Sequence, residues 1–126
     1  MVQEKQFVVE SIHAIDFADA QMPAVLSTPW LIWFLEHTAR EAVLPHLEPG
    51  ESTVGTDVEI SHLAATLVGE TVTCIARVVA TDGRQISFHI EARDRHELIA
   101  RGFHKLRVIQ VNRFAARLKQ KCSRAS

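Results

Sequence analysis

The sequence lacks any hydrophobic run long enough to cross a membrane, and it has few cysteines. Its longest uninterrupted apolar run, residues 30–35, is six residues long, whereas a membrane-spanning helix needs about twenty. The first residues are already charged and contain no apolar segment of the kind found in a secretory signal peptide. Cys74 and Cys122 form no C-x-x-C pair and are too few for a disulfide framework. We therefore expect a cytoplasmic protein with no membrane partner.

The composition excludes a disordered chain and gives no sign of a second domain. Hydrophobic residues make up 47% and charged residues 23% of the 126 positions, which is ordinary for a folded domain. No repeat, low-complexity tract or linker rich in proline, glycine or serine divides the chain. A chain of this length buries roughly two-thirds of its unfolded surface in one core. We expect one domain that spans residues 1–126.

Charge is nearly balanced in sum but unevenly distributed. The formal net charge is -1, yet residues 1–60 carry two basic and ten acidic side chains, whereas residues 61–126 carry twelve basic and five acidic ones. A basic half of this kind suits a small polyanionic ligand, although a solvated basic tail would look the same. Nucleic acid is not expected as a partner, because neither the net charge nor a recognition motif supports it.

One long helix is predicted for residues 28–44. Thr28 and Pro29 place an N-capping hydroxyl before a proline at the first helical position, and Pro45 marks the end. The first half of this helix, residues 30–35, is apolar on every side. A helix of that kind is buried rather than laid on a surface.

Strand periodicity dominates the rest of the chain. A first strand is predicted for residues 6–12, and four more follow the helix at residues 54–62, 71–81, 85–93 and 98–109. Asp82-Gly83 is a strong hairpin signal between the third and fourth strands. In the 54–62 strand the even-numbered residues should share one face and the odd-numbered residues the other. A short basic helix is predicted from about residue 112.

This order of elements favours an α+β architecture, the hotdog fold, in which a curved antiparallel sheet of about five strands wraps around one long buried helix. The alternative is a helix packed flat on one face of a sheet. That arrangement would leave Trp30 or Phe34 exposed unless a partner subunit covered them.

Two side chains are candidates for acid–base chemistry. Glu36 directly follows the apolar run, where its carboxylate would be partly desolvated and could act as a base. The alternative is an ion pair with Arg40, one helical turn further on. His62 ends the apolar face of its strand, where an imidazole could serve as general base. The alternative is a histidine at the edge of the core, hydrogen-bonded to backbone.

Further candidates surround the start of the helix and the strand after it. Thr28 is first of all a helix cap, but its hydroxyl and the free N–H groups of Trp30 and Leu31 could also bind an oxyanion. Gly55 interrupts a strand, where glycine often marks a bulge or a close ligand approach. His104 is more typical of a packing residue. No zinc-binding helix and no glycine-rich phosphate-binding motif is present, so no metal site is expected.

Several blocks of the sequence together resemble the fluoroacetyl-CoA thioesterase family of hotdog proteins. These blocks are residues 26–36, residues 47–56, residues 61–66 with Gly69, the hairpin at residues 82–84 and the segment 102–105. The resemblance implies hydrolysis of a small or medium acyl-CoA thioester with no metal and no cofactor beyond the coenzyme A of the substrate. It also implies a homodimer, or a dimer of dimers, whose sheets join edge to edge.

The resemblance also implies roles for individual residues. The threonine, glutamate and histidine that form the catalytic group of the family match Thr28, Glu36 and His62, and its substrate-facing strand glycine matches Gly55. Lys105, Arg107 or the basic C-terminal tail then becomes a candidate for the phosphates of coenzyme A, and Trp30 for the acyl pocket. The segment between first strand and helix is short, and Phe17 is its only aromatic residue, so selectivity for fluoroacetyl-CoA is not expected. The competing hypothesis is a hotdog module that binds acyl-CoA without catalysis.

Overall fold

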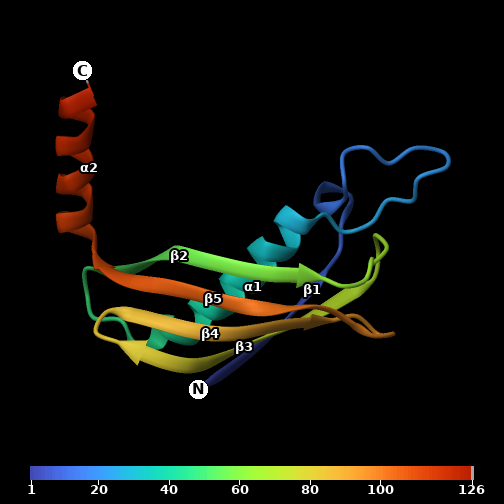
Figure 1. Ribbon diagram of the computed structural model, residues 1–126, viewed down its shortest axis with the longest axis horizontal. Coiled ribbons are helices and arrows are strands. Elements are labelled where there is room, and N and C mark those ends of the chain that lie inside the picture. The colour runs from blue at the N-terminus through green and yellow to red at the C-terminus, as the bar shows by residue number, and fades with distance from the viewer. Residues whose placement is uncertain (126) are drawn as a thin grey trace.

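The computed structural model describes residues 1–125, so Ser126 of the expected domain lies outside the described residues. Five antiparallel strands form one sheet in the order β1-β3-β4-β5-β2, and the long helix α1 packs against one face of it (Figure 1). The elements are β1 (Val2–Val8), a 3-10 turn (Ser11–His13), α1 (Thr28–Val43), a second 3-10 turn (Leu44–His46), β2 (Glu51–His62), β3 (Thr71–Asp82), β4 (Gln85–Arg93), β5 (Leu98–Gln110) and α2 (Val111–Ala125). The expected fold class is confirmed.

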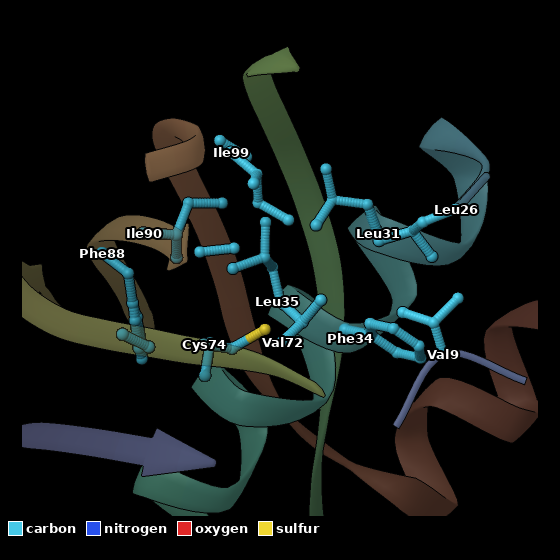
Figure 2. Packing of buried hydrophobic residues seen from close by; sticks show 14 of the residues in the cluster. Val9, Leu26, Leu31, Phe34, Leu35, Val72, Cys74, Phe88, Ile90 and Ile99 are labelled. Carbon is cyan, nitrogen blue, oxygen red and sulfur yellow. The ribbon is translucent and has the colours of Figure 1, made fainter. Parts of the chain in front are cut away.

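The core lies between α1 and the sheet. Leu31, Phe34 and Leu35 of α1 belong to the same buried cluster as Val72 and Ile90, and all five side chains are buried (Figure 2). Burial of a side chain of this size contributes roughly 1.5–3 kcal/mol. This cluster therefore fixes how α1 lies across the strands, and with it the direction of every other side chain on the helix.

The apolar first half of the helix predicted burial on every side, but α1 is not buried on every side. Phe34 is fully buried, but Trp33 is 42% exposed and packs at the surface against Phe7 and His37. In the described chain, only one face of α1 is covered by the sheet. The expectation of a fully enclosed helix is wrong for a single chain, because the five strands cover one side of it.

The first strand lies earlier than predicted. β1 runs from Val2 to Val8 and pairs antiparallel with β3, from Val2 opposite Arg77 to Val8 opposite Thr71. The predicted range 6–12 is wrong because the chain leaves the sheet after Val8 and forms the turn Ser11–His13. The ends of the remaining strands agree with the prediction to within about three residues.

A bulge in β2 decides which of its side chains face the helix. The pairing of β2 with β5 shifts between Gly55 and Asp57, so Thr56 is an extra residue. Gly55 lies opposite Leu106 and Val58 opposite His104, and both of these β5 residues are buried. The odd-numbered residues therefore face the helix before the bulge and the even-numbered residues after it. The predicted single even-numbered face is wrong for Val54 and Thr56, whereas Gly55 does mark a bulge, one of the two features expected there.

The C-terminal helix α2 begins at Val111 and projects away from the end of β5 (Figure 1). Its apolar residues Val111, Phe114 and Leu118 remain exposed. Within residues 1–125 no helix is both long enough and apolar enough to span a membrane.

Candidate active site

Ser27, not Thr28, caps the long helix. The hydroxyl oxygen of Ser27 accepts a hydrogen bond from the Trp30 backbone N–H at 3.4 Å, and its carbonyl oxygen accepts one from Leu31 at 3.0 Å. The prediction that Thr28 caps the helix is therefore wrong. So is the prediction that the Trp30 and Leu31 amides are free to bind an oxyanion, because Ser27 already occupies both. The shift of the cap by one residue leaves the Thr28 hydroxyl available for another partner.

That partner is His62. Thr28 begins α1 and His62 ends β2, and Thr28 Oγ1 lies 2.8 Å from His62 Nδ1. Burial lowers the pKa of His62, and an interaction with the Ala64 backbone opposes part of this effect. The imidazole is therefore neutral at physiological pH and can accept a proton. Thr28 is exposed, so a ligand can reach the hydroxyl while the histidine stays partly shielded.

The other imidazole nitrogen is unusual. His62 Nε2 is buried and has no hydrogen-bond partner among the described residues. An unpaired polar atom in such a position costs about 1–3 kcal/mol. Groups of this kind are uncommon in folded proteins and are concentrated at functional sites. This observation favours a functional role for His62 over that of a core-edge histidine.

Two apolar cavities open beside the Thr28–His62 pair. One, of about 360 Å³, is lined by both residues and by Phe17, Met22 and Leu63 among others. The second, of about 540 Å³, shares Thr28 and Phe17 with the first and has Trp30 in its wall. An apolar group bound here would meet the Thr28 hydroxyl at its edge. Trp30 thus lines an apolar cavity that also contains Thr28.

Glu36 lies at a separate place, beside Gly55 and His104. A methyl group added to Gly55 would lie 3.3 Å from His104 Cε1 and 3.5 Å from Glu36 Oε2. Glycine therefore leaves a small space open between backbone, carboxylate and imidazole. The alternative ion pair with Arg40 is not present among the described residues. Arg40 Nη2 instead donates to Ser52 Oγ at 3.5 Å.

The structure thus brings the candidate residues together in two groups. Thr28 and His62 form one group, and Glu36 and Gly55 form the other. Thr28 and Glu36 are eight residues apart on α1, which corresponds to about 12 Å along the helix axis. Within one chain, the Glu36 carboxylate therefore does not join the Thr28–His62 pair.

His104, for which the sequence favoured a packing role, lies beside Gly55 and Glu36. It is 3% exposed, and its Nδ1 lies 2.9 Å from the carbonyl oxygen of Asp57 at the bulge. Because alternate residues of a strand share one face, the sequence predicted only that His104 faces the same way as Ala100 and Gly102, toward the interior. Its burial agrees with this. Its position beside Glu36 depends on the register between β2 and β5, and no local pattern encodes that register.

Arg107 lies away from both groups. It pairs with Val54 and Gln85 on the face of the sheet opposite α1. Together with Arg84, Arg113 and other residues it lines a cavity of about 280 Å³ at the end of the sheet. Over the described part of the chain, no three His, Cys, Asp or Glu side chains are grouped so that they could hold a metal ion.

Comparisons with known proteins show the family of the chain. A family model described as the fluoroacetyl-CoA-specific thioesterase matches residues 8–112. The fluoroacetyl-CoA thioesterase of Streptantibioticus cattleyicolor is 36% identical over 102 residues, which is 81% of this chain and 73% of that protein. A crystal structure of a variant of the fluoroacetyl-CoA-specific thioesterase in complex with fluoroacetate and CoA is 32% identical. It superposes with a TM-score of 0.85 and covers 94% of this chain and 97% of that one.

A more distant structure shows the fold alone. A hot-dog-like protein from Thermanaerovibrio acidaminovorans is 20% identical and has a TM-score of 0.88, covering 96% of this chain and 90% of that one. The fold is therefore the hotdog fold. With a match of sequence that extends over most of its length, the chain belongs to the fluoroacetyl-CoA-specific thioesterase family.

Proposed function

We propose that this protein hydrolyses small or medium acyl-CoA thioesters to the free acid and coenzyme A, without a metal. The observation that carries the proposal is the 2.8 Å contact between Thr28 Oγ1 and His62 Nδ1 at the edge of an apolar cavity, in a chain that belongs to a thioesterase family. The cavity would hold the acyl chain and the hydroxyl would meet the carbonyl. Both cysteines are free thiols, which suits a reducing cytoplasm.

His62 is the general base in this mechanism. The attacking oxygen belongs either to Thr28 itself or to a water held by its hydroxyl, and its proton passes to His62 Nδ1 as the new C–O bond forms. The C–S bond then breaks, and the proton moves from the imidazole to the sulfur, which leaves as coenzyme A thiol. If Thr28 is the nucleophile, a water then attacks the ester and gives its proton to His62, the bond between the acyl carbon and Thr28 Oγ1 breaks, and the proton moves from the imidazole to Oγ1 as the free acid leaves. The backbone beside Gly55 is the proposed oxyanion contact, since the amides of Trp30 and Leu31 are occupied.

The catalytic site is completed by a second subunit. β2 is an edge strand of 12 residues, and exposed edges of this length pair readily with another chain. Antiparallel pairing of two β2 strands about an axis near Val58, which is 44% exposed, places the Gly55 end of each strand beside the His62 end of the other. Glu36 of one subunit then reaches the partner's Thr28–His62 pair, where its carboxylate orients the attacking water.

Thiol release from a panel of acyl-CoA esters tests the activity. The wild type should release coenzyme A from at least one short or medium ester, and Glu36→Gln and His62→Gln should abolish release while leaving the fold unchanged. Binding of acyl-CoA with no release from any ester would contradict the proposal and favour a non-catalytic binding module instead.

Mixing the two inactive variants tests the shared site. In a heterodimer of Glu36→Gln with His62→Gln, one site receives both native residues if the site is shared between subunits, and neither site does if it is built within one chain. Random reassociation should therefore restore about one quarter of the wild-type activity. No recovery, with heterodimers present by native mass spectrometry, would show that Glu36 and His62 act within the same chain.

A further inference from the structure

Four arginines from three different elements line one cavity at the end of the sheet. Arg84 comes from the turn between β3 and β4, Arg107 from β5, and Arg113 and Arg117 from α2, where they are one helical turn apart. The cavity has a volume of about 280 Å³. The Arg84 carbonyl accepts a hydrogen bond from the Val108 N–H at 2.9 Å, which holds the turn against β5.

Most of the positive charge around this cavity has no carboxylate partner within residues 1–125. No acidic residue lines it. Arg84 has an ion pair with Glu51 at 3.1 Å, whereas Arg107 has no carboxylate partner among the described residues, and neither Arg113 nor Arg117 has one. Several guanidinium groups around one space repel each other, and a bound polyanion would remove that repulsion. Guanidinium groups also match phosphate oxygens in bidentate geometry.

The cavity also contains an aromatic surface. Phe114 lies in its wall and is partly exposed. Aromatic rings of this kind stack on nucleobases, and each stacked base contributes about 1–3 kcal/mol. Phosphate-binding arginines beside an exposed phenylalanine are the combination that a phosphorylated nucleotide requires.

We propose that this arginine cavity binds the nucleotide end of the acyl-CoA substrate, with the phosphates held by Arg107, Arg113 and Arg117 and the adenine on Phe114. The proposal rests on the proposed function, because it names where the distant part of that substrate binds. The cavity lies at the end of the sheet where β2 begins, since Glu51 pairs with Gln110 there. From Gly55 to Glu51 the strand covers about 13 Å, and the pantetheine arm of coenzyme A is longer than that.

A comparison of two substrates isolates this site. The first is the acyl-CoA that the wild type hydrolyses fastest, and the second is the N-acetylcysteamine thioester of the same acid, which has no nucleotide. The double variant Arg113→Gln/Arg117→Gln should raise the KM for the acyl-CoA about tenfold or more. The kcat/KM for the N-acetylcysteamine thioester should be unchanged. Lys119→Gln/Lys121→Gln removes the same charge from the same helix outside the cavity and should change KM for the acyl-CoA less than twofold.

Equilibrium binding of adenosine 3′,5′-bisphosphate separates this inference from the proposed function. The wild type should bind this nucleotide, and the Arg113→Gln/Arg117→Gln variant should bind it at least tenfold more weakly. If no acyl-CoA is hydrolysed but this pattern of binding is seen, the proposed function fails and the nucleotide site stands. Equal KM values and equal binding in wild type and variant, with circular dichroism showing intact helices, would overturn the site itself.

Discussion

Two glycines on neighbouring strands should respond very differently to the same added methyl group. Gly102 on β5 lies opposite Ile60 on β2. A Cβ at this position would lie 1.9 Å from the carbonyl oxygen of Glu59 and 2.9 Å from the Cα of Ile60. Both are backbone atoms, which cannot rotate out of the way. Gly102→Ala should therefore force β2 and β5 apart.

The loss of stability in Gly102→Ala follows from how far the added Cβ would overlap the backbone of β2. Restoring an ordinary carbon–oxygen contact needs a movement of more than 1 Å, because non-bonded heavy atoms sit about 3.5 Å apart. Such a movement lengthens hydrogen bonds of about 2.9 Å beyond bonding distance. Loss of about three of them costs roughly 3 kcal/mol at about 1 kcal/mol each, and the smaller entropy of the unfolded alanine chain recovers less than about 1 kcal/mol. Gly102→Ala should lower the free energy of unfolding by about 2–4 kcal/mol.

Gly55→Ala is the matched control. Its Cβ would meet only side chains, at 3.3 Å and 3.5 Å, and these can shift by a few tenths of an ångström. Its free energy of unfolding should change by less than about 1 kcal/mol, whereas thioester hydrolysis should fall because the methyl group fills the space beside Glu36. Urea unfolding followed by tryptophan fluorescence measures both variants, since the chain has no tyrosine to overlap the signal. Equal unfolding midpoints for Gly102→Ala and wild type would refute the reasoning.

Three further predictions concern Thr28, His62 and the thiols. Thr28→Val should lower kcat/KM at least about a hundredfold, whereas Thr28→Ser should retain much of the activity; equal loss in both would show that the hydroxyl is not what matters. Burial lowers the pKa of folded His62 below the ordinary 6.5, so the unfolded chain binds the proton more readily than the folded chain. The free energy of unfolding should therefore keep its full value above about pH 6.5 and fall as the pH drops below it. His62→Gln should lose this part of the acid sensitivity in urea unfolding at about pH 5 and about pH 7.5, and an unchanged slope would contradict it. Burial raises the pKa of Cys74 to about 12, so a thiol reagent should titrate Cys122 alone in the native chain and both after unfolding; rapid reaction of two thiols in the native chain would be inconsistent with that burial.

The sequence predicted the elements well where the pattern was strong. The hairpin predicted from Asp82-Gly83 is present, but Asp82 still pairs with Gln85, so the two turn residues are Gly83 and Arg84, with Gly83 at φ 60°. The strand β1 was misplaced because most of Val2–Val8 is polar and only half-buried, so its pairing with β3 leaves little trace in the pattern of hydrophobic residues. The residues around Val9 are more apolar than most of β1, and the prediction of a strand at residues 6–12 followed them.

The identity of the catalytic candidates was more predictable than their arrangement. Glu36 stood out because it follows a run of apolar residues, and His62 because it ends the apolar face of a strand; both are local features. Their distribution into two groups depends on the bulge in β2 and on the length of α1, and these are properties of the assembled sheet. The capping role of Ser27 shows the same limit, since Ser27 and Thr28 are both good caps and only the backbone geometry chooses between them.

Because of the bulge at Thr56, the number of residues between Gly55 and His62 decides whether both of them face α1. Six residues separate Gly55 from His62, and with simple alternation an even number between them would put the two on opposite faces. The extra residue puts both on the face toward α1. If one residue between them were deleted, the strand could pair without the bulge and still keep both on that face, whereas one insertion would also allow pairing without a bulge but would move the histidine along β5, from opposite Ala100 to opposite Leu98. Related chains should therefore be aligned here by the distance between glycine and histidine, with a gap allowed at the bulge, rather than by matching hydrophobic positions one by one.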